Sequence, residues 1–476
     1  MFLESLFADP TKDNLTSLVW IYVSALAALF ILQWRSKNSV GLPIVYVFIY
    51  SMIHLIAAYV YTVPEYTPKS DILLQMGHSL QNTLLGFRIA TLGLLGFIAG
   101  VLICSFVFPV TFPVKNFLRA PAVTNKLPGT LIVISLLSFF ILAPIFRRIP
   151  SLGSMATAGT AMSVIGVFLY CWQAYQQKNT QRFLFGLLGI FIFPFLTIVF
   201  TGFASYGAAA AATICMMVVH FYKPRFVACI VLLLCLYGGL TFYANWMMHR
   251  DDIRASVWGE RTLSVRLEQA GKMIDDFELL NTNRHLHLEI IDGRLNQNDL
   301  VGKAYKQLNL GRVDYAYGYT MIVAAVAWVP RILWPGKPAT GGSGQVVSHF
   351  TGQKFAEGTS IGAGQALEFF VNFGWYGEFF GFLVLGLLIR YVDERAGFYL
   401  MHQDYWSCAR WLLPGIGLMQ PGGLLAELTG SFAAFAVFGY ALHQVFFKQF
   451  YELGDLKLYD AAGRNNQRKP NRRRYS

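Results

Sequence analysis

Hydrophobic runs long enough to cross a membrane alternate with short polar segments along most of the chain. A transmembrane helix needs ~20 mostly apolar residues, because the hydrocarbon core of a bilayer is ~30 Å thick. Eleven runs approach that length, eight before residue 248 and three after residue 365. The pattern predicts an all-α, polytopic membrane helix bundle of about eleven spans. The runs cover about 17–33, 40–62, 86–110, 129–146, 153–175, 183–203, 205–222, 226–247, 366–390, 404–420 and 427–447.

These runs divide the chain into four regions. Residues 1–247 are expected to form an N-terminal membrane bundle of about eight spans, and residues 366–447 a C-terminal bundle of about three. Between them, residues 248–365 form a large polar loop, and residues 448–476 form a basic tail poor in apolar residues. Because the number of spans is odd, the two termini should lie on opposite sides of the membrane.

Lysine and arginine in the short loops indicate the orientation. Cytoplasmic loops carry an excess of these residues, and here one set of loops holds eleven of them and the other set three. We therefore place the first set and the C-terminus in the cytoplasm, and the N-terminus and the large loop outside. The first set is Arg35, Lys37, Lys115, Arg119, Lys126, Lys178, Arg182, Lys223, Arg225, Arg390 and Arg395, and the second is Lys69, Arg147 and Arg148.

The segment near residues 319–334 of the large loop contains an apolar run that is too short to cross the membrane and is followed by Pro330. Arg331 and Lys337 come next. A charged side chain costs at least a few kcal/mol in hydrocarbon but little at the membrane surface. We therefore expect an interfacial or re-entrant segment that holds both cations at headgroup depth, with Trp334 as an aromatic anchor.

Two other parts of the large loop predict local structure. Residues 284–289 alternate between polar and apolar side chains, which fits either a strand or a short helix. Further upstream, apolar residues at helical spacing predict an amphipathic helix, which would lie on the bilayer or pack against the ends of the spans. Packing is the favoured alternative. The apolar positions of this helix are Leu263, Leu267, Ala270, Ile274 and Phe277.

Composition agrees with a membrane protein and argues against two other classes. Of the 476 residues, 55% are hydrophobic and 13% are charged, which does not fit a set of ordinary soluble domains. The formal net charge is +12, but much of it lies in short loops and in the tail. That distribution suits an anionic inner leaflet, and we expect no nucleic-acid partner.

Cations gather at the expected outer face. Arg147 and Arg148 end a span there, and Arg331 and Lys337 lie at the same depth. Arginine forks bind phosphate oxygens at two points, so the set predicts a site for a lipid-linked phosphate or pyrophosphate. Headgroup anchoring without a substrate is the alternative, and it is favoured for Arg147 and Arg148 taken alone. The large loop adds Arg284, Arg294 and Arg312 to the set.

Glu368 and His349 are the candidates for a general base. Glu368 begins a span after a segment rich in glycine and other small residues, where a substrate can approach the backbone closely. His285 and Asp314 are rivals for the role. Each of these four residues, taken singly, also fits a purely structural role.

The sequence gives no indication of a metal or cofactor. It contains no HExxH motif, no phosphate-binding P-loop and no pair of CxxC motifs, and its six cysteines lie in or beside apolar runs. One further carboxylate needs an explanation, because Glu378 lies ten residues into its span, where an unpaired charge is costly. Arg410 in the next span is its expected partner.

Four short motifs occur in a fixed order over roughly 75 residues. This order resembles the bacterial polysaccharide-repeat polymerases of the Wzy class, which include the O-antigen and enterobacterial common antigen polymerases. Such polymerases often carry a Gly-Ser/Thr-Arg motif at the outer start of a middle span. The corresponding segment, residues 201–207, has no arginine, so either Arg147 substitutes for it or the substrate differs. The four motifs are Gly318-Tyr-Thr-Met-Ile-Val, Pro330-Arg-Ile-Leu-Trp-Pro-Gly-Lys-Pro, Gly358-Thr-Ser-Ile-Gly and Phe373-Gly-Trp-Tyr-Gly.

The resemblance implies polymerisation of polyprenyl-pyrophosphate-linked oligosaccharide repeat units on the outer face of the bacterial cytoplasmic (inner) membrane. Membrane lipid, a chain-length regulator and a flippase are the implied partners, and no cofactor is implied. An O-antigen-ligase-like transferase, another outer-face lipid-linked sugar transferase, and a non-enzymatic lipid-oligosaccharide exporter are the alternatives.

Within that chemistry, each candidate residue receives a role. Arg331, Lys337, Arg147, Arg148 and Arg284 would bind the substrate pyrophosphate, and the first four would offset the leaving-group charge. Glu368 or His349 would accept the proton of the acceptor hydroxyl. Trp334 and Tyr319 offer flat faces on which sugar rings can stack.

Overall fold

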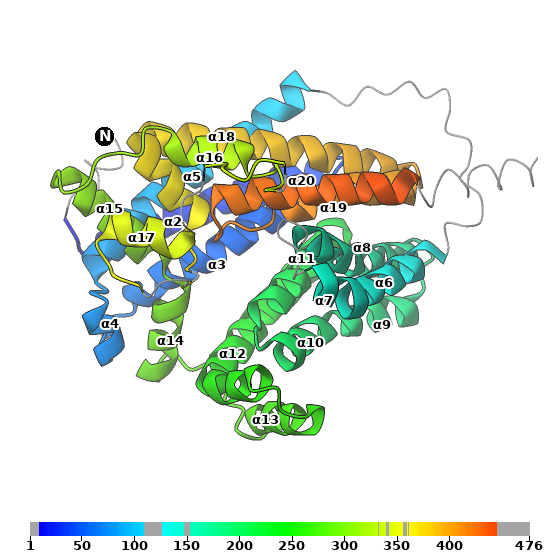
Figure 1. Ribbon diagram of the computed structural model, residues 1–476, viewed down its shortest axis with the longest axis horizontal. Coiled ribbons are helices and arrows are strands. Elements are labelled where there is room, and N and C mark those ends of the chain that lie inside the picture. Colours follow the sequence, from blue (N-terminus) through cyan, green and yellow to red (C-terminus); the bar gives the residue numbers. More distant parts are fainter. Residues whose placement is uncertain are drawn as a thin grey trace, which may run out of the picture.

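The computed structural model describes residues 9–108, 126–146, 153–331, 333–338, 342–355, 359 and 361–444. Within these ranges every regular element is helical, and nine helices are long and apolar enough to cross a membrane (Figure 1). This confirms the prediction of an all-α, multi-pass membrane protein.

The helices follow the alternation of apolar and polar segments. Most begin at a glycine, proline or capping polar residue and contain an apolar run. In chain order they are α2 (Lys12–Arg35), α3 (Leu42–Thr62), α4 (Asp71–Gln75), α5 (Leu80–Val107), α6 (Leu127–Leu137), the π-helix η3 (Ser138–Leu142), α7 (Ala143–Phe146), α8 (Gly153–Gln176), α9 (Thr180–Ile190), α10 (Ile192–Thr201), α11 (Ser205–Phe221), α12 (Arg225–Trp258), α13 (Leu263–Asp275), α14 (His285–Leu295), α15 (Gln297–Asn309), α16 (Tyr319–Val326), α17 (Ser343–Thr351), α18 (Gly364–Met401), α19 (Tyr405–Gly417) and α20 (Leu425–Leu442).

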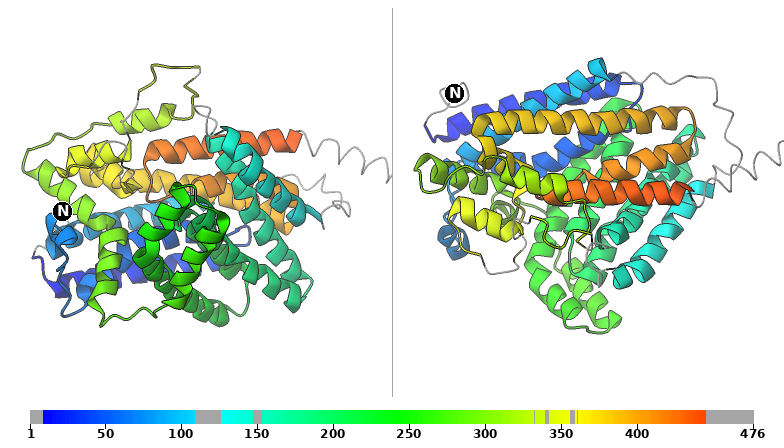
Figure 2. Two further views of the ribbon diagram at one scale, coloured as in Figure 1. Left: turned by 60° about the horizontal axis from the view of Figure 1, so that its bottom comes forward. Right: turned by 45° about the horizontal axis from the view of Figure 1, so that its top comes forward.

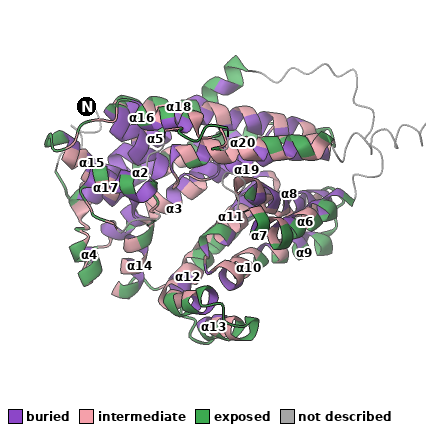
Figure 3. Ribbon diagram, in the orientation of Figure 1, coloured by how far each residue is buried: buried purple, intermediate pink, exposed green. Residues whose placement is uncertain are grey.

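The main bundle is built around α5 and α18. Their contact is close because Gly93, Gly96 and Gly100 on α5 face α18, and a methyl group at any of them would clash with α18. Small residues allow helix backbones to approach in this way. Helices α2, α3 and α15 complete the bundle, and Figure 3 shows its buried residues concentrated where these helices meet.

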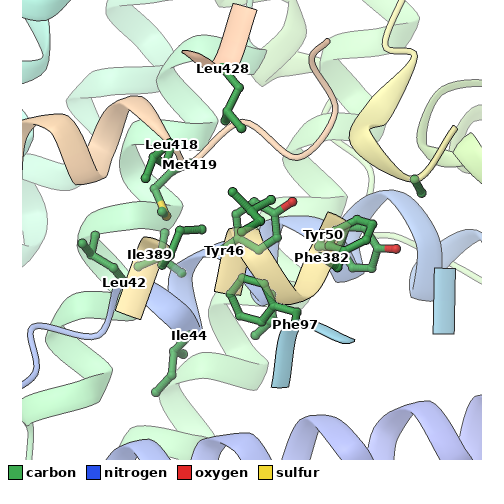
Figure 4. Close-up of a cluster of buried hydrophobic side chains, with 14 of the residues drawn as sticks. Leu42, Ile44, Tyr46, Tyr50, Phe97, Phe382, Ile389, Leu418, Met419 and Leu428 are labelled. Atoms are coloured by element: carbon green, nitrogen blue, oxygen red, sulfur yellow. The ribbon is translucent and has the colours of Figure 1, made fainter. Parts of the chain in front are cut away.

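Aromatic rings fill the centre of this bundle. Tyr46 stacks on Phe97 at a centroid distance of 4.9 Å, and Tyr50 meets Phe382 edge-on at 5.2 Å. Figure 4 shows these rings beside Met419, which comes from the segment between α19 and α20. The core therefore joins the beginning, middle and end of the chain.

A second group of helices, α6 to α13, packs on one side of the main bundle through α8 and α11 (Figures 1 and 2). Several boundaries here differ from the prediction. The expected span 183–203 corresponds to Thr180–Thr201, which counts as one of the nine apolar helices although Phe191 separates α9 from α10. α12 continues to Trp258, beyond residue 247. α11 is a helix of only 17 residues. Local hydropathy alone marks where an apolar run ends, whereas a helix continues while its backbone can hydrogen-bond.

The last helices also differ from their predicted bounds. α18 continues to Met401 instead of ending at residue 390, and its backbone is non-helical at Phe373 and Gly374. α19 has only 13 residues, and the apolar run continues into a non-helical segment. The prediction placed Arg390 in a short cytoplasmic loop, but it belongs to α18 and its side chain is buried. It forms ion pairs with Asp393 and Glu394.

The large loop is folded into short helices. Residues 285–289 begin α14, so the alternative of a strand is wrong. The predicted amphipathic helix is α13, but Leu263, Leu267 and Ile274 on it are exposed, while Ala270 is buried. α13 packs on α10 and α12 through Met273, as the favoured alternative expects, but most of the predicted apolar stripe is exposed. An exposed apolar stripe is typical of a helix that lies on a membrane surface.

A buried polar network attaches the large loop to the bundle. Asp292 on α14 accepts hydrogen bonds from the hydroxyls of Tyr61 and Tyr66, at 2.8 and 2.7 Å. Its other oxygen lies 3.1 Å from Nδ1 of His78 and 2.7 Å from the amide of Asn296. These contacts satisfy the buried carboxylate, as burial of a charged group requires.

Candidate functional site

The element that carries most of the predicted site is α16 with the turn after it. α16 follows Gly318, whose φ of 86° favours glycine, and it has only eight residues. One face packs on α18 and α20, where the Thr429 hydroxyl donates to the carbonyl of Ala324 at 2.7 Å. The turn after α16 projects from the bundle (Figure 2, left panel, yellow-green). The run expected to be too short to span is thus a short helix at the edge of the bundle.

Exposed apolar side chains cover the outer side of this element. They continue from the helix into the turn, where Leu333 is 76% and Trp334 is 43% exposed. A water-facing turn would not carry so many large apolar groups, so this pattern favours contact with lipid at the membrane interface. The exposed residues are Tyr319, Ile322, Trp328, Leu333 and Trp334.

Lys337 and Arg331 occupy this turn in different ways. The ammonium of Lys337 donates to the carbonyls of Ala327 and Val329, at 2.8 and 2.7 Å, and so satisfies the end of α16. Burial and the nearby charge of Arg331 lower the pKa of Lys337. Arg331 is exposed, and its Nη1 lies 3.4 Å from the carbonyl of Pro335. The turn therefore holds two neighbouring cations, of which Arg331 is the accessible one.

Glu368 lies at the other end of α16 and is only 1% exposed. Its Oε2 accepts the backbone N–H of Leu425, the first residue of α20, at 2.7 Å. The Thr320 side chain of α16 also lies within hydrogen-bonding reach of this carboxylate, although Oε1 makes no well-formed hydrogen bond with the described residues. Asn372, one turn later, accepts the N–H of Gly318 and donates to the Thr320 hydroxyl. Glu368 and Asn372 together fix the junction of α16, α18 and α20.

The remaining candidates lie elsewhere. His349 is exposed on α17, which packs on α15, and Arg284 forms an ion pair with Glu278 before α14. Arg147 and Arg148 lie outside the described residues. The fold thus gathers Arg331, Lys337 and Trp334 in one turn, and places Tyr319 and Glu368 at the other end of α16. The described residues contain no group of three or more His, Cys, Asp or Glu that could hold a metal ion.

The family model described as "Domain of unknown function (DUF8712)" matches residues 44–400. The chain belongs to this family. No curated protein and no solved structure matches the chain. The match covers the chain from α3 almost to the end of α18, so the DUF8712 region includes α16, its turn and Glu368. The description of the family names no activity.

Glu378 of this DUF8712 chain lacks the partner expected for it. Its side chain is fully buried, and neither carboxylate oxygen has a hydrogen-bond partner among the described residues. It lies against Gly93 of α5, whereas Arg410 is exposed and lines a small cavity with Trp406 and His443. The predicted pairing of Glu378 with Arg410 is therefore wrong, because Glu378 faces α5, whereas Arg410 lies beside side chains of α6, α8 and α20.

Two arginines stand out that the sequence analysis did not select. Arg254 on α12 donates from Nε to the carbonyl of Gly202 at 3.1 Å and lies over the ring of Phe203. It thus reaches the segment 201–207 that lacks an arginine of its own, but from 52 residues away, where no sequence pattern connects the two. Arg88 on α5 is 2% exposed. The sequence could have identified it, because no other charged residue occurs in the apolar run 86–110.

Proposed function

We propose that this chain polymerises polyprenyl-pyrophosphate-linked oligosaccharide repeat units on the outer face of the bacterial cytoplasmic membrane. One observation carries the proposal. Arg331 is exposed on a turn that projects from the bundle among apolar side chains, with Lys337 fixed beside it. A cation in this setting suits the pyrophosphate of a lipid-linked sugar, whose lipid tail stays in the membrane.

The reaction is a glycosyl transfer. The acceptor hydroxyl oxygen attacks the anomeric carbon of the donor, and the bond from that carbon to the pyrophosphate breaks. The pyrophosphate leaves with the electron pair, and the hydroxyl proton passes to a base. Arg331 binds the departing oxygens at two points, and Lys337 adds positive potential from its fixed position. Because pyrophosphate is already a good leaving group, no general acid is required.

Glu368 is the proposed base, since this residue of α18 lies beside Thr320 in the first turn of α16 and its Oε1 makes no well-formed hydrogen bond with the described residues. Its burial requires α16 to move aside before a hydroxyl can reach it, so this role is tied to a movement of α16. His349 on α17 is exposed and is the alternative base. Tyr319 and Trp334, both exposed, are the proposed sugar-stacking surfaces.

The proposed topology has eleven crossings, with the N-terminus outside and the C-terminus in the cytoplasm. Two short helices would cross besides the nine long ones. Gly202, before α11, contacts the far end of α12, and His220, near the end of α11, lies against Gly41 at the start of α3. The segment after α19 returns to the start of α18, where the N–H of Gly364 donates to the carbonyl of Gly422 at 3.0 Å. These contacts support full crossings by α11 and α19.

Substitution of Arg331 tests the function. Arg331→Ala removes the charge and the planar fork, and a lost charge-assisted hydrogen bond of ~1.5–3 kcal/mol corresponds to roughly a ten- to hundred-fold loss of rate. We expect a deletion strain complemented with Arg331→Ala to make little polymer and to accumulate single repeat units. Arg331→Lys keeps the charge but loses the fork, so polymer should reach an intermediate level. Gel analysis of the polysaccharide provides the measurement.

Arg261→Ala is the matched control, since Arg261 is an exposed arginine of the same loop that lies after α12. It should make normal polymer at normal protein level. Wild-type amounts of polymer from Arg331→Ala would overturn the assigned role. Loss of transfer to a final acceptor, with polymer length unchanged, would indicate the ligase-like alternative instead.

A further inference from the structure

Three arginines meet where α12 and α14 pack together. Arg250 and Arg254 lie one helical turn apart near the end of α12, and Arg294 lies near the end of α14. Because α12 and α14 pack together, the positive charges of the three side chains are close enough to repel one another. Like charges four residues apart on a helix destabilise it, so this arrangement has a cost.

Arg254 is held in place by backbone and aromatic contacts. Its Nε donates to the carbonyl of Gly202, and its guanidinium carbon lies 4.6 Å from the ring centroid of Phe203 and 5.1 Å from that of Trp258. Gly202 has a φ of 74°, and a methyl group there would press on Arg254 and Trp258. Since Nε is engaged, the donors left for another ligand are on the two terminal nitrogens.

One acidic side chain, Asp251, offsets part of the positive charge of this cluster, because it interacts with both Arg250 and Arg254. Arg250 meets only Asp251, at 3.6 Å, and the Asp251 side chain is 92% exposed. Across the described ranges, neither Arg254 nor Arg294 has an acidic side chain within ion-pair distance. Nearby acids are engaged elsewhere, because Asp276 contacts His249 and Glu278 pairs with Arg284. The cluster therefore retains a net positive charge that an anion would offset.

The cluster lies at headgroup depth. α12 has 34 residues, which is about 51 Å at 1.5 Å per residue, whereas the hydrocarbon core is ~30 Å thick. Counted from Arg225 at the first end, the core ends near Asn245, so Arg250 and Arg254 lie just beyond it. Trp258, which is 59% exposed, lies beside Arg254, as aromatic residues do at a membrane interface.

We propose that Arg250, Arg254 and Arg294 form a binding site for a phosphate or pyrophosphate group at this membrane surface. A pyrophosphate offers several oxygens to arginine forks, and three cations match its charge. The site is separate from Arg331 and its turn. It rests on its own contacts and does not require that the chain polymerise sugars.

Binding of inorganic pyrophosphate to the purified full chain in detergent tests the site. Isothermal titration at fixed ionic strength is carried out in the Arg331→Ala background, which lacks the accessible cation of the other proposed pyrophosphate site. This chain should still bind pyrophosphate, and adding Arg250→Ala/Arg294→Ala should weaken binding about ten- to hundred-fold. This double variant keeps Arg254 and its contact with Gly202, so the fold is preserved, and its melting temperature verifies that. If the double variant melts early, Arg294→Ala alone applies the same test from an exposed side chain. Arg261→Ala removes one charge outside the cluster and should bind normally.

The source of the phosphate is distinguished by two further probes. Phosphatidylglycerol added to nanodiscs should displace pyrophosphate if a lipid headgroup occupies the site. Geranylgeranyl pyrophosphate should bind more tightly than inorganic pyrophosphate if a lipid-linked pyrophosphate occupies it. Either result supports a phosphate site that the double variant weakens. The proposal is overturned if the Arg331→Ala chain binds none of the three probes, or if adding Arg250→Ala/Arg294→Ala leaves its binding unchanged.

Discussion

Asp292 on α14 accepts several polar contacts where the large loop meets the bundle. Burial acts to raise the pKa of Asp292, but the hydrogen bond and charge of His78, with the hydrogen bonds of Asn296 and Tyr66, outweigh it. The pKa is therefore lower than the ordinary value of 3.8. A carboxyl with a lower pKa in the folded state stabilises that state above its ordinary pKa, and this contribution is lost as the pH falls through the folded value.

The pH dependence of unfolding tests this sign. At pH 7, the free energy of unfolding of Asp292→Asn should be roughly 1–3 kcal/mol smaller than that of the wild type. The variant should therefore unfold at a lower temperature. The difference should shrink as the pH falls below about 3.8, because the wild-type carboxyl then becomes protonated as well. Asp275→Asn, at an exposed acid on α13, should match the wild type throughout. A difference between Asp292→Asn and the wild type that stays constant across this range would contradict the assignment.

Single residues were the hardest part of the site to predict. The sequence indicates that Arg331 and Lys337 share a turn, because they are six positions apart with Pro335 and Gly336 between them. It does not indicate that Glu368 is buried, since its partner Leu425 lies 57 residues away. The contact between His78 and Asp292 spans 214 residues and is equally invisible. Local pattern predicts neighbours in the chain, whereas burial and charge pairing depend on which helices meet.

At the scale of elements, the non-helical segment after α19 is the most unusual feature of the fold. Leu418, Met419 and Leu424 in it are buried, so its backbone cannot rely on water. The side chain of Gln365 supplies part of what is missing. Its amide donates to the carbonyls of Gln420 and Gly423, at 2.7 and 2.8 Å.

Gln365→Leu should destabilise the protein by roughly 1–3 kcal/mol, because it removes the side-chain donor to the Gly423 carbonyl and the acceptor of the Tyr46 hydroxyl. The Gln420 carbonyl loses one of its two donors and keeps the N–H of Gly423. Thermal unfolding of the purified protein in detergent is the measurement. Gln345→Leu, at an exposed position on α17, is the matched control and should have little effect. Equal stability of the two variants would show that the segment finds other donors.

Elements were predicted well where their cause is local. The apolar run before Pro330 is short in the sequence and short in the structure, as α16. The helical spacing of Leu263 and Leu267 is likewise present in α13. The environment of α13 was predicted only in part, because helical periodicity identifies an apolar stripe but does not identify which of its residues are covered. The break in α18 at Gly374 was not predicted either, because a glycine in an apolar run can mark a helix break, a close helix contact or neither.

At the scale of the whole molecule, the number and order of apolar runs predicted the membrane bundle, but the way its two groups of helices pack was beyond the sequence. The contact of α5 with α18 joins residues almost 300 positions apart through facing glycines. Glycines are common in apolar runs, so their register across two helices becomes apparent only in the fold. The order of crossings, by contrast, follows from the chain and is directly testable.

Reporter fusions at three turns test the crossing order. Fusions after Lys223, between α11 and α12, and after Gln403, between α18 and α19, should report the cytoplasm, and a fusion after Lys337 should report the outside. The physical reason is that positive loops stay inside, while α11 and α19 have contacts at both ends that fit full crossings. Paired alkaline phosphatase and fluorescent protein fusions give opposite signals on the two sides, which guards against poor expression. If the Lys223 fusion reports the outside, α11 does not cross. If the Lys337 fusion reports the cytoplasm, the large loop faces inward and the proposed outer site of transfer is excluded.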